Sequence, residues 1–147
     1  MTPIASLDDL TPGQSFDFGT LAFSEAEIIA FATLYDPQAF HLDPEAAKES
    51  LFGELIASGL HTLSACFGRI MGSGVFGAVS EGGNRIDTRW PAPLRAGETI
   101  AIRTEVVQTK PSRTGRPLGV AILRHTATRV ADGVVVMEAT GTHFLRR

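Results

Sequence analysis

The chain has 147 residues, of which 44% are hydrophobic and 20% are charged, and its net charge is −3. This length predicts a single domain spanning residues 1–147 with a core of its own, and the composition excludes a wholly disordered protein. The slightly acidic balance argues against a nucleic-acid partner, because phosphate binding requires a concentrated basic excess.

The single cysteine, Cys66, has no second thiol with which to form an internal disulfide. Residues 1–9 lack the basic start and the apolar run of a secretory signal. The longest mostly apolar stretch, residues 55–71, is broken by Ser58, His61, Ser64 and Arg69 and is shorter than the roughly 20 residues that a membrane-spanning helix needs. We therefore expect a soluble, cytoplasmic protein without a membrane partner.

The first elements along the chain are a strand and a helix. A first strand is expected over residues 15–23. Ser24 and Glu27 then have the spacing of a capping box, and the apolar residues that follow recur at intervals of three and four. This helix is expected to end at Asp36, because the residue before a proline is disfavoured in the helical region.

Two further helices are predicted before residue 73. Asp43 followed by Pro44 is typical of an acidic N-cap with proline in the first helical position. The next helix is expected from Ser58–Gly59 to Gly72. Apolar residues occupy most of its circumference, which is typical of a largely buried helix.

A glycine-rich segment, residues 72–84, separates the helical half from the strands. Its first six residues match the pattern G-x-G-x-x-G of dinucleotide-binding loops. That fingerprint requires a strand before it and a helix after it, whereas here a helix precedes and a loop or strand follows. We therefore interpret the segment as a loop after a helix and reject a nicotinamide cofactor.

The second half of the chain alternates with the period of strands. Ile86, Thr88 and Trp90 share one face of a first strand, and further strands are expected over residues 99–109, 120–130 and 134–144. Their short connections, including the Asp-Gly turn near residue 132, require antiparallel pairing. Helices followed by an antiparallel meander predict an α+β domain in which the sheet wraps the third helix.

Several reactive side chains have an ordinary structural explanation. Cys66 lies in an apolar helical face, which favours a buried structural thiol over a nucleophile. His41 and Asp43 lack a further ligand at a standard spacing, so no metal site is expected. The remaining histidines carry no assigned function. His61 lies in the first turn of the third helix, and His125 and His143 are expected to be half-buried strand residues.

The segment of residues 35–43 differs from these. It places Asp36 and His41 five residues apart in a proline-stiffened, irregular stretch between two helices. A carboxylate and an imidazole that converge on one point can hold a water molecule and move its proton. A helix-terminal turn residue and a surface histidine would give the same pattern, so the segment alone leaves both interpretations open.

A longer pattern surrounds this pair. Asp36-x4-His41-x-Asp43 is followed by Ala46-Ala47, Phe52-Gly53 and Leu55-Ile56-Ala57-Ser58-Gly59, and later by Trp90-Pro91-x-Pro93-Leu94-x-x-Gly97-Glu98. The combination resembles the MaoC-like dehydratases, the (R)-specific enoyl-CoA hydratase group. The chain departs from the family motif at Gln38 and Ala39, which replace Asn-Pro, and at Ser58, which replaces the commoner histidine.

The resemblance implies a hot-dog fold, in which a long central helix is wrapped by an antiparallel sheet and two protomers form at least a homodimer. It also implies that Asp36 and His41 activate water and that the backbone N–H of Gly59 donates to a thioester carbonyl. Ser58 would lie at the substrate, where its replacement of histidine would alter substrate preference.

The expected reaction is reversible hydration of a trans-2-enoyl-CoA to an (R)-3-hydroxyacyl-CoA, a reaction of fatty acid metabolism. Coenzyme A would be part of the substrate, and no separate cofactor is expected. Two alternatives remain: a hot-dog acyl-CoA thioesterase, and a non-catalytic subunit that binds acyl thioesters.

The hairpin loop of residues 110–117 holds three cations and no acid in eight residues. Lys110, Arg113 and Arg116 are therefore candidates for binding the phosphates of coenzyme A. A solvated hairpin tip would have the same composition, and both interpretations stay open.

Overall fold

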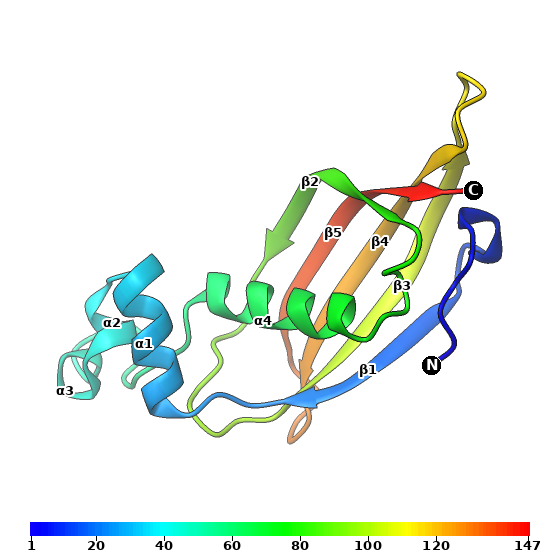
Figure 1. Cartoon of the computed structure of the whole chain (residues 1–147). Coiled ribbons are helices and arrows are strands. Elements are labelled where there is room, and N and C mark those ends of the chain that lie inside the picture. The colour runs from blue at the N-terminus through cyan, green and yellow to red at the C-terminus, as the bar shows by residue number, and fades with distance from the viewer.

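All the helices and strand β1 lie in the first half of the chain, and the other strands lie in the second half, in a computed structural model that describes residues 1–147 (Figure 1). The helical elements are η1 (Leu7–Asp9), α1 (Glu25–Tyr35), α2 (Ala39–Leu42), α3 (Pro44–Ala47) and α4 (Gly59–Gly72). The strands are β1 (Ser15–Leu21), β2 (Ser80–Arg89), β3 (Ile100–Pro111), β4 (Leu118–Arg129) and β5 (Val135–Arg146).

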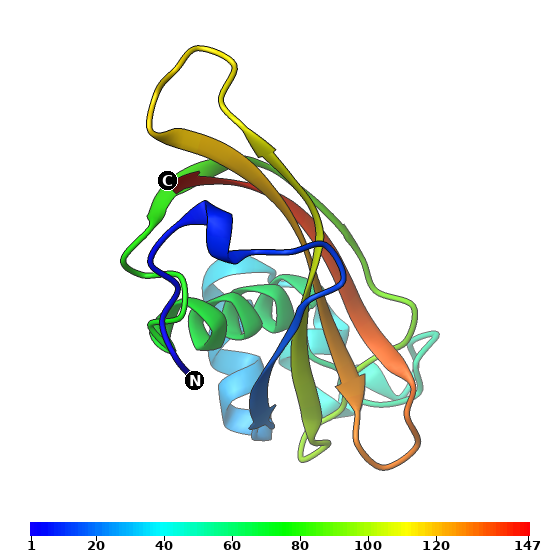
Figure 2. The same ribbon diagram turned by 90° about the vertical axis from the view of Figure 1, so that its right-hand side faces the viewer.

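The five strands form one antiparallel sheet in the order β1-β3-β4-β5-β2. The strands β3, β4 and β5 are the predicted meander, and β1 and β2 pair with its two outer members. The sheet curves around α4 (Figure 2). The predicted α+β class, with an antiparallel sheet around a long helix, is confirmed.

Local sequence signals account for the ends of α1 and α4. Ser24 Oγ accepts from the Glu27 amide at 3.1 Å while Glu27 Oε2 accepts from the Ser24 amide at 2.7 Å, which completes the predicted capping box. Ser58 caps α4 by accepting from the Leu60 amide at 3.2 Å. Side-chain caps of this kind satisfy amides that have no partner within the helix.

The core lies between one face of α4 and the concave face of the sheet. Of the residues on α4, Thr62, Cys66 and Ile70 are buried, whereas Leu60 is 46% exposed. The prediction of a largely buried α4 was therefore wrong for the single chain. The sheet covers only one side of the helix, so the apolar residues on its other side remain partly accessible.

Four other predictions need correction. The stretch of residues 35–43 is not wholly irregular, because it contains the one-turn helix α2. The glycine-rich segment forms turns only as far as Val79, and β2 begins at Ser80 and ends before Trp90. His125 and His143 are buried rather than half-buried.

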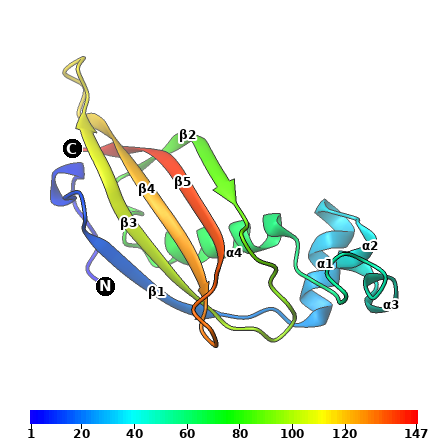
Figure 3. The same ribbon diagram turned by 180° about the vertical axis from the view of Figure 1, so that it is seen from behind.

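The two ends of α4 face different parts of the molecule. Helices α1, α2 and α3 gather beyond its N-terminal end, whereas the hairpin loop between β3 and β4 projects from the opposite end of the sheet (Figures 1 and 3). No helix here combines the length and apolar character that crossing a membrane requires.

Candidate active site

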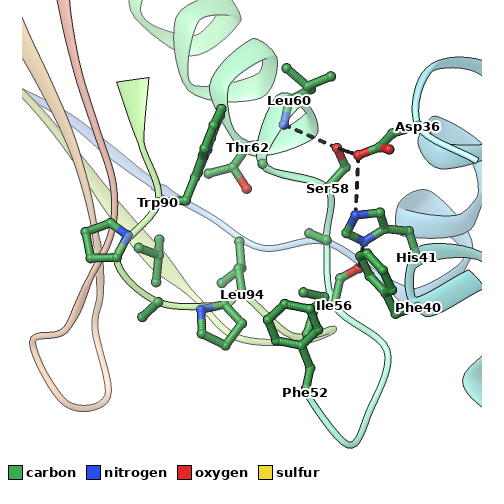
Figure 4. A pocket seen from close by; sticks show the side chains of 16 residues that line it. Asp36, Phe40, His41, Phe52, Ile56, Ser58, Leu60, Thr62, Trp90 and Leu94 are labelled. Atoms are coloured by element: carbon green, nitrogen blue, oxygen red, sulfur yellow. Dashed lines mark hydrogen bonds and ion pairs between the residues drawn. The ribbon is translucent and has the colours of Figure 1, made fainter. Parts of the chain in front are cut away.

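A cavity of about 420 Å³ lies at the N-terminal end of α4 (Figure 4). Its walls come from the end of α1, from α2, from residues 52–60 and from the segment that follows β2. Its lining includes four residues predicted from the motif, Asp36, His41, Ser58 and Gly59. The other lining residues are mainly apolar: Phe40, Phe52, Ile56, Ala57, Leu60, Thr62, Trp90, Pro91, Ala92, Pro93, Leu94 and Val136.

Asp36 is the C-cap of α1 and presents its carboxylate to this cavity. Ser58 Oγ donates to Oδ2 at 2.6 Å and Gln38 Nε2 donates to Oδ1 at 2.7 Å. The hydrogen bond from Ser58 is the main cause of a lowered pKa at Asp36; partial burial opposes it, and Gln38 and His41 lower the pKa further. Asp36 is therefore held as a carboxylate.

His41 is only 4% exposed and is fixed by a main-chain contact. Its Nδ1 lies 2.7 Å from the carbonyl oxygen of Ile56. Because a carbonyl oxygen only accepts, Nδ1 carries the hydrogen in this arrangement. Nε2 is then the nitrogen that can gain or lose a proton, and it lies 3.3 Å from Asp36 Oδ2.

Ser58 and Gly59 form the turn that enters α4. Ser58 is fully buried and links the carboxylate of Asp36 to the first turn of the helix. The amides of Leu60, His61 and Thr62 all bond to Ser58, whereas the N–H of Gly59 has no partner within the chain. An unpaired N–H at the positive end of a 14-residue helix is suited to stabilising a negatively charged oxygen.

The structure thus brings Asp36, His41, Ser58 and Gly59 together around one cavity. Their placement fits the predicted chemistry, and Ser58 additionally contacts Asp36, which the sequence did not predict. Lys110, Arg113 and Arg116 are not brought to this cavity. Lys110 lies at the end of β3, and Arg113 and Arg116 lie in the loop between β3 and β4, at the far end of the sheet (Figure 1). The cavity lining contains no lysine or arginine.

Sequence reasoning missed part of the wall of the cavity. Phe40 packs edge-on against His41, with ring centroids 4.5 Å apart, and Phe52 packs against Phe40 at 5.4 Å. Trp90 contacts Gly59 from the other side: a Cβ added at Gly59 would lie 2.5 Å from the indole ring. The resemblance contains Phe52 and Trp90 as motif residues, but nothing in their spacing predicts that they face the same cavity.

The other histidines lie outside this cavity. His61 is stacked between Phe23 and Phe31, with ring centroids 3.8 and 4.5 Å away, and burial lowers its pKa. His125 and His143 approach each other through their Nε2 atoms at 3.3 Å. Thr104 Oγ1 lies 2.8 Å from His125 Nδ1, so this polar cluster crosses the sheet beneath α4.

A second cavity, of about 860 Å³, lies between α4 and the strands β2 and β5. Its lining contains Arg85 and His143 but no carboxylate. Of these two cavities, only the one at the start of α4 combines a carboxylate, an imidazole and a free helix N–H.

Comparison with known proteins identifies the family. The sequence profile described as a MaoC-like domain matches residues 8–130. The chain is 32% identical over 108 residues to an uncharacterised Bacillus subtilis protein, YdeM, covering 73% of this chain and 77% of that protein.

Solved structures agree with this match. The MaoC-like dehydratase from Rhodospirillum rubrum superimposes with a TM-score of 0.89 at 33% identity, covering 97% of both chains. The (R)-hydratase from A. caviae has a TM-score of 0.69 at 22% identity, covering 93% of this chain and 96% of its own. A Mycobacterium tuberculosis protein with a double hot-dog fold has a TM-score of 0.79 at 21% identity, covering 96% of this chain and 44% of its own. The chain adopts the hot-dog fold and belongs to the family of MaoC-like domains.

Proposed function

We propose that this protein adds water reversibly to the double bond of a trans-2-enoyl-CoA and gives an (R)-3-hydroxyacyl-CoA. One observation carries the proposal: the Asp36 carboxylate and His41 Nε2 lie 3.3 Å apart at a cavity that the unpaired Gly59 N–H also borders. The family is one of dehydratases, and the (R) configuration is proposed from the likeness to (R)-hydratases.

The geometry suggests how the water is activated. Nε2 of His41 has a free lone pair, because Nδ1 donates to Ile56, and Asp36 carries negative charge. A water molecule bound by both groups would give one proton to Nε2 while its oxygen attacks Cβ. The imidazolium that forms is stabilised by the adjacent carboxylate. Asp36, whose pKa is lowered, carries negative charge and orients the water.

The electrons of the double bond move toward the thioester, and negative charge develops on its oxygen. The Gly59 N–H would stabilise that oxygen, and such a donor is typically worth about 3–4 kcal/mol of barrier. The proton on Nε2 is then delivered to Cα, so that the elements of one water have been added and His41 is neutral again. Dehydration follows the same steps in reverse.

A homodimer is part of this proposal. Strand β2 lies at an edge of the sheet, pairs only with β5, and is exposed at most of its positions. Antiparallel pairing of two β2 strands across a two-fold axis would satisfy that edge. It would also carry the partner's hairpin of residues 110–117 to the end of the sheet at which this chain's cavity lies. Sedimentation that shows a fully active monomer would contradict the dimer.

Crotonyl-CoA separates the proposed function from its alternatives. A hydratase lowers the enoyl absorbance without releasing a thiol, whereas a thioesterase releases free coenzyme A. A binding subunit does neither. Loss of absorbance without thiol release is the expected result, and thiol release or an inert mixture contradicts the proposal. The cytoplasmic location remains a prediction.

A further inference from the structure

The cavity is divided into a polar side and an apolar side. Asp36, His41 and Ser58 meet on one side, and Trp90 stands across the cavity from them (Figure 4). Phe52 and Leu94 belong to the apolar part of the lining. Once the thioester carbonyl is near Gly59 and the double bond is near His41, the rest of the acyl chain has mainly apolar surface to contact.

No free cation of the same chain faces this apolar side. Two arginines lie just outside it, and each is already paired with carboxylates. Arg95 pairs with Glu54 and Glu98. Arg129 pairs with Asp132, at 2.7 Å, and with Glu98, at 3.7 Å. Within one protomer, a second carboxylate on the acyl chain would therefore lose its hydration without gaining a partner, which is costly for a charged group.

Trp90 forms part of the cavity wall. Its indole lies against Gly59, so it closes the wall next to the start of α4. The cavity volume of about 420 Å³ is near the lower end of the range of roughly 300–1,000 Å³ that is usual for small-molecule sites. This volume must hold the reacting water and the thioester as well as the acyl chain.

The segment that carries Trp90 is anchored on both sides. Before it, Arg89 Nε donates to Glu138 on β5 at 3.2 Å. After it, the Pro93 carbonyl accepts from Arg129 Nη1 at 3.1 Å. Prolines at positions 91 and 93 restrict the intervening backbone further. The wall is thus held in place on each side of the indole.

We propose that the cavity accepts a short, uncharged acyl chain and that Trp90 is the specificity-determining residue that sets the length limit. This inference rests on the proposed function and adds the substrate class to it. The excluded substrates are long acyl chains and chains that carry a second carboxylate.

Two substrate comparisons test the proposal, one for the exclusion of a second carboxylate and one for the limit on chain length. Pent-2-enoyl-CoA and glutaconyl-CoA have the same number of acyl carbons and differ by a terminal methyl against a terminal carboxylate. The wild-type kcat/KM should be at least about 100-fold higher for the uncharged member. Across crotonyl-, hexenoyl- and octenoyl-CoA, kcat/KM should fall at least about tenfold from the shortest to the longest.

Variants of Trp90 locate the length limit. Trp90→Ala should raise the ratio of kcat/KM for octenoyl-CoA to that for crotonyl-CoA by about tenfold or more. Trp90→Phe, which keeps an aromatic wall and serves if the alanine variant does not fold, should raise it less. Leu51→Ala, at a residue that is 96% exposed and outside the cavity, should leave the ratio unchanged.

Calorimetric binding of saturated butanoyl-, hexanoyl- and octanoyl-CoA measures the same preference without catalysis. If these ligands show the length preference but no enoyl thioester is hydrated, the proposed function fails and the inference about the cavity stands. Equal kcat/KM values for pentenoyl- and glutaconyl-CoA would overturn the proposed exclusion of a second carboxylate. A length profile that neither Trp90 variant changes overturns the assignment of Trp90.

Discussion

The cavity at the start of α4 and the buried cluster beneath its middle each contain a histidine whose Nδ1 meets an oxygen atom. The difference is at Nε2. In His41 it faces a carboxylate at the edge of a cavity, whereas in His125 it faces a second buried imidazole. A histidine next to a carboxylate and open to substrate can exchange protons. A histidine buried without a charged partner is kept neutral and contributes hydrogen bonds instead.

Burial alone does not separate the two regions. His41 is 4% exposed and His125 is 1% exposed. What differs is the partner: Asp36 is an ionised carboxylate, whereas burial and the neighbouring His143 lower the pKa of His125 to about 3. We therefore expect substitutions in the first region, the cavity with Asp36 and His41, to change turnover. Substitutions in the second region, the buried cluster of His125 and His143, should change stability.

The largest expected effect is on catalysis by the first region. His41→Ala and Asp36→Asn should each lower kcat by about 10²–10⁴-fold, as is typical for the loss of a general acid or base. His41→Ala should also cost about 1–3 kcal/mol of stability, because it leaves the buried Ile56 carbonyl without its partner. Thermal unfolding measured beside turnover separates the two effects. Near-wild-type turnover in either folded variant would contradict the mechanism.

Lowering the pH should reduce the free energy of unfolding through the second region, the buried His125 and His143. The pKa values of His125 and His143 are lowered by burial, so as the pH falls below about 6.5 the unfolded chain binds protons that the folded chain does not. The free energy of unfolding should fall by about 1.4 kcal/mol per pH unit for each histidine, from pH 6.5 down toward its folded pKa. Above that range both states are neutral and these two residues contribute no slope.

His125→Gln tests this prediction, because glutamine keeps a hydrogen-bonding amide but cannot titrate. Urea unfolding between pH 7 and pH 4 should give a shallower pH dependence for the variant than for the wild type. Turnover at pH 7 should be unchanged, since this residue is remote from the proposed chemistry. An unchanged slope would show that the buried pair does not control acid stability.

Gly59→Ala tests how tightly the first region is packed. The added methyl would lie 2.5 Å from the Trp90 indole, so either the helix start or the indole must move. Overpacking of this kind typically costs about 1–3 kcal/mol of stability. The double variant with Trp90→Ala should recover most of that loss in chemical denaturation. If the double variant is no more stable than Gly59→Ala, the contact between the two residues does not limit the site.

Ser58→Ala should move the pH dependence of the reaction. The hydroxyl of Ser58 is the largest cause of the lowered pKa at Asp36, so its removal raises that pKa. The acid limb that reports protonation of Asp36 in the profile of kcat/KM against pH should shift to higher pH. Ser58→Thr, which keeps the hydroxyl, should leave the limb in place. The alanine variant should also lose about 1 kcal/mol from the N-cap of α4.

The smallest expected effect concerns the hairpin between β3 and β4. If its cations bind the phosphates of coenzyme A on a partner's cavity, Arg113→Ala or Arg116→Ala should raise KM for the CoA thioester and hardly change kcat. The KM for a phosphate-free N-acetylcysteamine thioester should be unaffected by either substitution. Added salt should raise the KM of the wild type for the CoA thioester, as the substitutions do. Equal effects on both thioesters, or none, would leave the hairpin as a solvated turn.

Much of the fold could be predicted because its signals are local. The capping box at Ser24 and the alternation of the strands predict elements from neighbouring residues. The one-turn helix α2 was missed because four residues give no period, and Gln38 before it makes no side-chain cap. The partial exposure of α4 was missed because a sequence of apolar residues does not say which side the sheet covers.

The candidate site was predictable only where a motif spans it. The resemblance placed Asp36, His41 and Gly59 together, and the structure brings them to one cavity. The contact of Ser58 with Asp36 joins residues 22 apart, and that of His41 with Ile56 joins residues 15 apart. Both contacts exist only in the folded chain: the first lowers the pKa of Asp36, and the second fixes which nitrogen of His41 carries the hydrogen. The loop cations were grouped by composition, which carries no information on distance from the cavity.

The central claim is that His41 performs the chemistry on an enoyl thioester while His125 supports the fold. Chromatographic identification of the product that the wild type, His41→Ala and His125→Gln form from crotonyl-CoA tests it most directly. We predict (R)-3-hydroxybutanoyl-CoA from the wild type and from His125→Gln, and unchanged substrate from His41→Ala. Free coenzyme A as the product, or equal product from all three proteins, would contradict the account.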